Sequence, residues 1–174
     1  MRVKARFHAQ PLLSVFAMIV DLQNVIQALR NELHQYGEML ALLEQQQHLA
    51  QHSGAEEILR SISHINQQSG SIQLARERRK SAQRYLAGAL QQAENATFST
   101  LIPLLPNSYQ PMVSALVQEN HELLGRVRER AQANQLLLRR ALELMQRFIT
   151  TLTLEDSPMD TSNRVVPLEQ PALI

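Results

Sequence analysis

Two histidines come closest to a metal-binding pattern in this chain. His48 and His52 are four residues apart on one face of a predicted helix, a spacing at which two imidazoles can bind one metal ion. They stand among Gln45, Gln47 and Gln51, and no third ligand lies nearby in the sequence. Glu-x-x-His pairs, which hold two metal ions in some helical bundles, do not occur. We therefore expect surface histidines and no metal site.

Composition argues against the other common kinds of active site. The 174 residues include no Cys, no Trp and only 5 Gly. Without Cys there can be no thiolate zinc site, disulfide or cysteine nucleophile, and five glycines leave little material for a phosphate-binding loop. No set of Ser, His and Asp accompanies a nucleophile elbow. We expect no catalytic residue, no cofactor and no enzymatic activity.

The densest run of charge is basic. Its members are Arg76, Arg78, Arg79, Lys80 and Arg84. On a helix these side chains spread around the axis, and no aromatic residue is interleaved to stack on bases. The whole chain carries 17 basic and 16 acidic residues, a net charge of +1, so no overall field attracts nucleic acid. We expect a solvated surface or a docking site for an acidic partner. A basic helical regulator that binds nucleic acid remains an alternative.

The elements that carry these residues are predicted from hydrophobic spacing. From residue 15 onward, apolar residues recur at alternating steps of four and three, which is the seam of a long helix with an equally long partner. The series is Val15, Ile19, Leu22, Ile26, Leu29, Leu33, Tyr36, Leu40 and Leu43. Hydrophobic residues make up 44% of the chain but aromatics only 4%, which favours an aliphatic core between helices over a β-sandwich. The spacing predicts a first helix over about residues 12–52.

A second clear seam predicts a helix over about residues 111–152. Its series is Val113, Leu116, Asn120, Leu123, Val127, Ala131, Asn134, Leu138, Ala141, Met145, Phe148 and Leu152. Two of these positions are asparagines. In coiled coils a buried Asn lowers stability and fixes register or partner, which is the role we expect for Asn120 and Asn134. The alternative is that both stand at the edge of a wide apolar stripe.

Weaker spacing between these helices predicts a helix over about residues 54–94, with a kink or break at Ser69-Gly70. A short helical connector flanked by prolines follows at 98–105. We therefore predict an all-α protein, an elongated antiparallel bundle or coiled coil of three main helices in a domain of residues 1–152. The remaining residues, 153–174, are rich in proline, acidic residues and isolated aliphatics, which predicts a disordered tail.

The start of the chain is weakly similar to a signal peptide. Arg2, Lys4 and Arg6 precede an apolar stretch at 12–20, but no small-x-small cleavage site follows. The stretch is also shorter than the roughly 20 apolar residues that a membrane-spanning helix needs. We expect a cytoplasmic protein without membrane insertion.

The last predicted helix resembles the signature segment of the FlgN family of flagellar type III export chaperones. The resemblance rests on LVQENHELL at 116–124, RAQANQLLL at 130–138 and ALELM at 141–145. The leucine-rich first helix fits the family as well, as does ARERR at 75–79 ahead of LIPLLP at 101–106. In order and length the resemblance covers about residues 14–152.

The resemblance implies a cytoplasmic chaperone that binds the terminal helices of hook-associated subunits, the proteins of the hook–filament junction, and keeps them soluble before export. It places client binding at the end of the last helix and in the tail. The corresponding residues are Leu144, Met145, Phe148, Ile149, Leu152, Leu154, Val165, Val166 and Leu168. The export gate or its ATPase complex is a further candidate partner, although no aromatic residue follows Phe148 to match the family's gate-docking tyrosine. A generic coiled-coil scaffold or adaptor, self-associating as a homodimer, remains the alternative.

Overall fold

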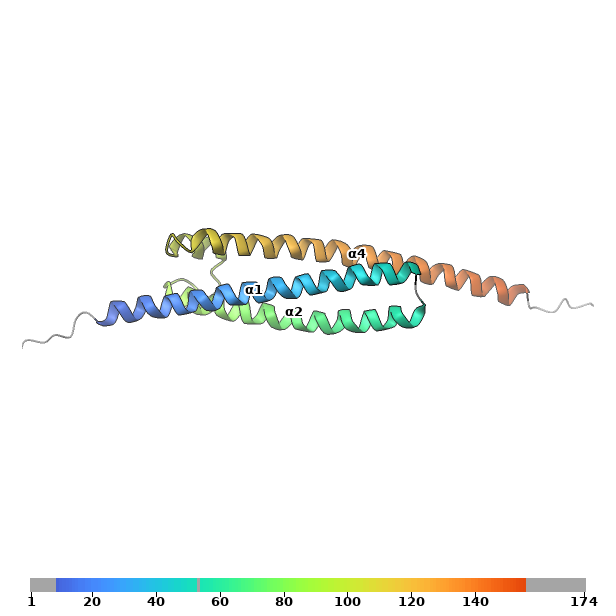
Figure 1. The fold of residues 1–174 in the computed structure, drawn as a ribbon, viewed down its shortest axis with the longest axis horizontal. Coiled ribbons are helices and arrows are strands. Elements are labelled where there is room, and N and C mark those ends of the chain that lie inside the picture. Colours follow the sequence, from blue (N-terminus) through green and yellow to red (C-terminus); the bar gives the residue numbers. More distant parts are fainter. Residues whose placement is uncertain (1–8, 53, 156–174) are drawn as a thin grey trace, which may run out of the picture. The chain divides into compact units, whose positions relative to one another are not determined.

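The structure, a computed structural model, describes residues 9–52 and 54–155. Every regular element within these ranges is a helix, which confirms the predicted all-α class (Figure 1). The elements are α1 (Ala9–His52), α2 (Ala55–Ala89), α3 (Phe98–Leu101), the 3-10 helix η1 (Ile102–Leu104) and α4 (Gln110–Glu155). The predicted short connector at 98–105 corresponds to α3 and η1.

The helices form two compact units, Met1–Leu137 and Leu138–Ile174. The first unit holds α1, α2, α3, η1 and the part of α4 that ends at Leu137. In the second unit, the described residues are the rest of α4. None of the described helices combines the length and apolarity that crossing a membrane would require.

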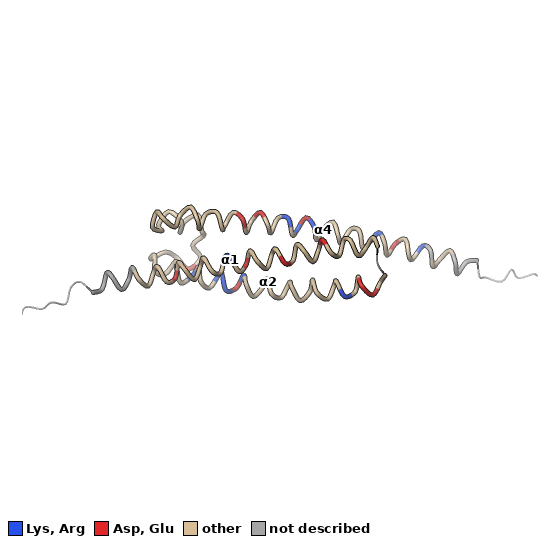
Figure 2. Tube along the Cα trace, viewed as in Figure 1, with Lys and Arg blue, Asp and Glu red and all other residues tan. Residues whose placement is uncertain are grey.

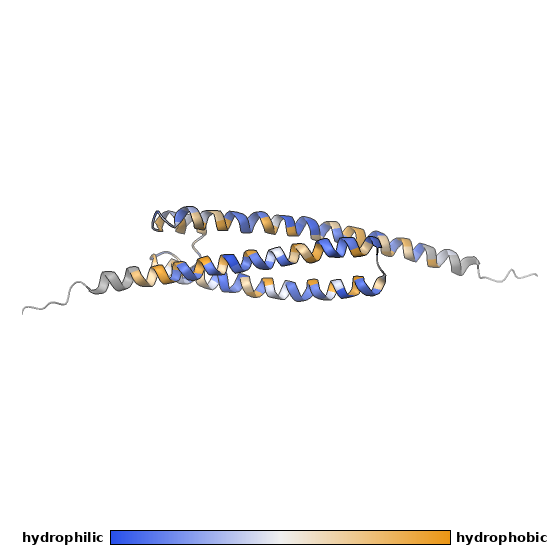
Figure 3. Cartoon of the chain, in the orientation of Figure 1, coloured by the Kyte–Doolittle hydropathy of each residue, from blue (hydrophilic) through white to orange (hydrophobic). Residues whose placement is uncertain are grey.

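The core of the first unit is built around α1, which packs against both α2 and α4 (Figure 1). The seam residues predicted from spacing are buried on α1 from residue 22 onward, apart from half-buried Leu33. Val25 and Met39, outside the predicted series, are buried too. The buried face of α1 is wider than the predicted seam because two helices cover it, and Figure 3 shows hydrophobic residues along the length of α1.

Hydrogen bonds from two asparagine side chains of α4 show how this helix lies along α1. Asn120 Nδ2 donates to the carbonyl oxygen of Leu29 at 3.1 Å, and Asn134 Nδ2 donates to that of Leu43 at 2.7 Å. Each pair is 91 residues apart, so the two helices run parallel. Because 91 is a multiple of seven, their heptads are in phase.

α2, which lies between α1 and α4 in the sequence, runs antiparallel to α1. Glu32 of α1 pairs with Arg79 of α2. Gln46, which is later in α1, donates from its Nε2 to the hydroxyl oxygen of Ser61, which is earlier in α2, at 3.3 Å. Successive long helices are therefore antiparallel, as predicted.

The predicted interruption at Ser69-Gly70 does not break the helix. α2 continues from Ala55 to Ala89, and the Ser69 hydroxyl donates to the Ile65 carbonyl oxygen at 2.9 Å. Gly70 is exposed, with nothing within 4 Å of the position that a Cβ would occupy. A glycine in the middle of a helix costs about 1 kcal/mol relative to alanine, which the long antiparallel packing of α2 on α1 outweighs.

α2 ends earlier than the predicted residue 94. Two backbone bonds close its last turn: Gln92 N–H donates to the Ala87 carbonyl oxygen at 2.8 Å and Gln91 N–H to that of Gly88 at 3.0 Å. Gln91 has a φ of 55°, the left-handed conformation that normally calls for glycine in this type of helix end. The sequence has no glycine at 91, so the usual stop signal for a helix was missing.

Candidate functional site

The second unit exposes large apolar side chains on α4. The exposed fractions are 59% for Leu142, 66% for Leu144, 56% for Met145 and 54% for Ile149. Soluble proteins rarely leave a contiguous group of large apolar residues in water unless it binds something. The segment is therefore a candidate partner-binding surface.

These side chains share one face of the helix. At roughly 100° per residue, the positions from Leu144 through Ala141, Met145 and Ile149 to Leu142 span about 160° of the helix circumference. We call this set, together with Leu138, the apolar face. The remaining positions of the segment with described side chains carry charged and polar residues: Arg139, Arg140, Glu143, Gln146, Arg147, Thr150 and Thr151. Figure 2 shows basic residues alternating with an acidic one in this part of α4.

The predicted partner-binding residues fall into three groups. Leu144, Met145 and Ile149 lie together on the apolar face. The other predicted positions have no described side chain. Phe148, Leu152 and Leu154 lie in α4 without described side chains, and Val165, Val166 and Leu168 lie outside the described residues. Leu142 also lies on the apolar face, although it is not among the predicted positions.

A family comparison bears directly on this segment. A sequence model described as FlgN protein matches residues 18–162. That range covers most of the chain and includes the apolar face. The chain belongs to the FlgN family. FlgN proteins are flagellar export chaperones. No curated protein and no solved structure matched the chain.

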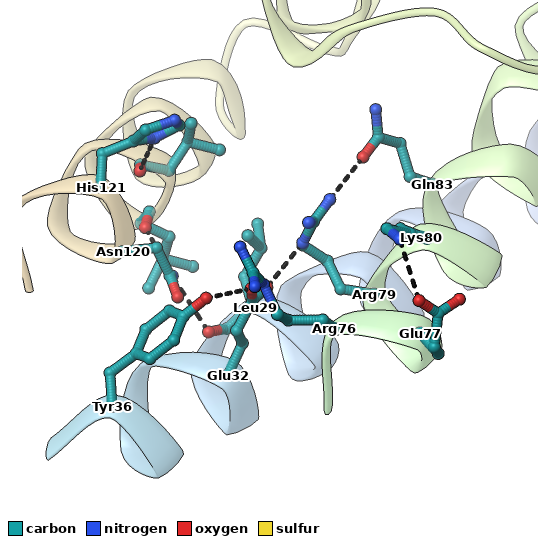
Figure 4. A network of polar contacts seen from close by, with 12 residues as sticks. Leu29, Glu32, Tyr36, Arg76, Glu77, Arg79, Lys80, Gln83, Asn120 and His121 are labelled. Carbon is teal, nitrogen blue, oxygen red and sulfur yellow. Dashed lines mark hydrogen bonds and ion pairs between the residues drawn. The ribbon is translucent and has the colours of Figure 1, made fainter. Parts of the chain in front are cut away.

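The first unit of this FlgN-family chain contains a buried polar cluster that sequence analysis did not predict (Figure 4). Glu32 is only 3% exposed, and its carboxylate accepts hydrogen bonds from Arg79 Nε at 2.6 Å and from the Tyr36 hydroxyl at 2.8 Å. Arg76 Nε lies 3.6 Å from the same carboxylate. The Arg79 guanidinium also donates to Gln83 Oε1 at 2.9 Å. Glu32 is thus a buried charge compensated by two arginines.

The predicted basic run therefore divides into two parts. Arg76 and Arg79 face Glu32 on α1, whereas Lys80 pairs with exposed Glu77 at 2.9 Å. Sequence position could have signalled Glu32, which lies three residues after Leu29 and four before Tyr36, both on the seam. An acidic residue there, matched by a basic run on the next helix, indicates an interhelical ion pair.

A cavity of about 450 Å³ lies beside this cluster. Its walls combine Arg76 and Gln83 of α2, Phe98 of α3 and Asn120 of α4 with apolar residues of α1 and α4. Asn120 Oδ1 is buried without a hydrogen-bond partner among the described residues, while its Nδ2 donates to Leu29 and Leu116. The cluster links α1 to α2. The Glu32 carboxylate is already paired with Tyr36, Arg76 and Arg79, which fits a structural role better than a catalytic one.

The histidine pair considered for metal binding has a different arrangement. The rings of His48 and His52 stack with their centroids 4.5 Å apart, and His52 Nδ1 lies 3.0 Å from the His48 carbonyl oxygen. Within residues 9–52 and 54–155, no group of three or more His, Asp or Glu residues is placed to hold a metal ion.

The acidity of Tyr36, a member of the buried polar cluster, is strongly shifted. Burial, and then the hydrogen bond to the Glu32 carboxylate and the negative charge of that carboxylate, raise the pKa of Tyr36 to about 12. The folded-state pKa lies above the ordinary value of 10.0. The stability that Tyr36 contributes is therefore complete below about pH 10 and is lost as the pH rises toward 12.

We expect Tyr36→Phe to reduce the loss of stability at alkaline pH. The wild-type chain should lose about 2 kcal/mol through this group between about pH 9 and about pH 11.5, and the variant should not. Urea unfolding at the two pH values measures the difference. Tyr85→Phe, at an exposed tyrosine, is the matched control and should behave as wild type. Equal alkaline losses in all three proteins would contradict the assignment.

Proposed function

We propose that this chain is a cytoplasmic export chaperone that binds the terminal helices of hook-associated flagellar subunits and keeps them soluble before type III secretion. The observation that carries the proposal is the exposed apolar face of α4, in a chain of the FlgN family. The proposed binding residues are Leu144, Met145, Phe148, Ile149, Leu152, Leu154, Val165, Val166 and Leu168, joined by Leu142.

The mechanism is masking. A client helix that polymerises through its own apolar stripe is protected when that stripe packs on the apolar face. Burial of roughly 600 Å² of apolar surface would contribute about 15 kcal/mol before the costs of association and ordering. That contribution is sufficient for a complex that forms in the cell and releases its client at the export gate or its ATPase complex, the further partner that we propose.

Removal of residues 153–174 tests the proposal. We expect the truncated chain to bind a purified hook-associated subunit about tenfold more weakly, measured by isothermal titration calorimetry. Helicity and the melting temperature should stay nearly unchanged, because the core clusters lie within residues 18–127. If truncation instead unfolds the protein, the tail is structural and the assignment is wrong.

The scaffold alternative is disfavoured by the position of the two asparagines. Asn120 and Asn134 are buried and bond to α1 of the same chain. Their seam is therefore occupied within the monomer, and a homodimer would have to use another face. We propose that these two residues fix the register of α4 on α1.

Asn120→Val together with Asn134→Val tests this register role. Valine occupies the equivalent layer at Val127, and both asparagine Oδ1 atoms are buried without a partner. We expect the double variant to gain about 1 kcal/mol or more in the free energy of unfolding and to self-associate because register is no longer specified. Urea unfolding and sedimentation velocity measure the two effects. A destabilised variant that stays monomeric would contradict the role.

A further inference from the structure

The first turns of α1 carry large apolar side chains on the side of the helix that faces away from the core. Phe16 is 69% exposed and Val20 is 44% exposed. At roughly 100° per residue, these two positions lie about 130° and 170° from the middle of the buried face of residues 22–29. Leu13 is three residues before Phe16, so its position is on the same side of the helix. We call positions 13, 16 and 20 the outer stripe.

The outer stripe is local to the start of α1. Met18, on the other side of the same turns, packs against the core cluster that contains Leu22, so this end of the helix belongs to the folded first unit. Beyond Val20, the outer side of α1 carries exposed amide side chains, beginning with Gln23 and Gln27. Apolar residues continue along the core side of the helix. A group of exposed apolar residues at one end of a helix whose outer side is polar over the next turns is typical of a binding surface.

The charge of the same end of the chain indicates the kind of partner. Arg2, Lys4 and Arg6, which lie outside the described residues, precede α1, and the first acidic residue of the chain is Asp21. The whole chain has a net charge of only +1, so this excess of positive charge is local. Basic residues beside an exposed apolar helix face that contains phenylalanine are typical of helices that lie in the interface of an anionic membrane. A protein partner for the outer stripe would not require such one-sided charge.

We propose that the start of α1 binds the surface of a membrane that contains anionic lipids. The outer stripe enters the boundary between headgroups and acyl chains, and Arg2, Lys4 and Arg6 pair with the lipid phosphates. Three charges or three apolar residues alone give weak attachment, but the two signals act on the same surface at once. The core side of α1 keeps its contacts with α2 and α4, so the first unit binds in its folded form. The site is separate from the apolar face of α4 and does not depend on the proposed function.

Co-flotation of the full-length chain with lipid vesicles tests the proposal. Vesicles of phosphatidylcholine alone are compared with vesicles that also contain phosphatidylglycerol, which supplies negative charge. We expect about tenfold stronger binding to the anionic vesicles, and this binding should weaken as salt is added. Phe16→Ser with Val20→Ser should lower the binding about tenfold. Tyr85→Ser with Leu74→Ser removes side chains of similar exposure from α2 and should leave the binding as in wild type.

A second variant tests the contribution of charge. Arg2→Ser with Lys4→Ser and Arg6→Ser should reduce binding to the anionic vesicles to the level measured with phosphatidylcholine alone. Unchanged binding by this variant, or equal binding of the wild-type chain to both kinds of vesicle, would overturn the assignment of an anionic surface.

The remaining outcomes concern the outer stripe. Absence of vesicle binding, or wild-type binding by the Phe16 and Val20 variant, would overturn the proposal. Sedimentation velocity detects the alternative in which a second copy of the chain covers the stripe: a wild-type dimer that this variant cannot form would also overturn the proposal. Affinity for a hook-associated subunit should be unchanged in the same variant. Loss of that affinity would assign the stripe to client binding instead of lipid binding, whereas loss of vesicle binding alone leaves the proposed function intact.

Discussion

Replacing Leu142 and Met145 with glutamate should reduce affinity for a hook-associated subunit by about a hundredfold, which corresponds to about 3 kcal/mol. Both side chains lie on the apolar face and are more than half exposed in the free chain. The substitutions remove no core contact, but they place two carboxylates where a client helix must exclude water. Calorimetry with the purified subunit measures the affinity, and circular dichroism measures the melting temperature, which should not change.

Matched controls are available on α2. Leu59 and Leu74 are exposed leucines of the first unit, with exposures similar to those on the apolar face. Leu59→Glu with Leu74→Glu should leave client affinity near wild type, since neither residue belongs to the proposed surface. If the α2 pair weakens binding as much as the α4 pair, client recognition depends on general hydrophobicity and the proposed surface is wrong.

Glu32→Ala should lower the free energy of unfolding by about 3–4 kcal/mol. The substitution leaves the largely buried Arg79 guanidinium without its carboxylate and the buried Tyr36 hydroxyl without its acceptor. Removing one partner of a buried ion pair is costly because the other charge stays desolvated. Urea unfolding at neutral pH measures the loss.

Two comparisons isolate the cause of that loss. Glu77→Ala breaks an ion pair with Lys80 at a similar distance, but both groups are about half exposed, so it should cost far less stability than Glu32→Ala. Combining Glu32→Leu with Arg79→Met removes both charges and should recover most of the stability. If this double variant is as unstable as Glu32→Ala, packing and not the stranded charge accounts for the effect.

The long helices were predictable because their seams repeat over many turns. Apolar residues that recur at alternating steps of four and three from Leu22 to Leu43 are typical of a helix that packs along a long neighbouring helix. The number of neighbours was not predictable from that repeat. Because α1 has two, its buried face extends beyond the seam to Val25 and Met39.

The same limit accounts for the residues that were missed. A charged residue such as Glu32 is normally assigned to the solvated face of its helix. Its burial depends on two arginines of α2, and the residue pattern of α1 alone holds no information about them. For Asn120 and Asn134, the spacing left open whether the side chains are buried or lie at the edge of a wide apolar stripe. Both are buried because carbonyl groups of α1 accept their hydrogen bonds, and those groups belong to another helix.

The constant separation of 91 residues between matched layers of α1 and α4 restricts how the length of this chain can change in evolution. One residue gained or lost inside either helix turns every later side chain by roughly 100° and moves the asparagines away from their acceptors. Only seven-residue changes made in both helices keep the layers matched. Residues 90–97 and 105–109 lie outside the helices, so a change in their number turns neither helix as long as Leu105 keeps its place in the core. Relatives should therefore differ in length at these turns and agree in length between the matched layers.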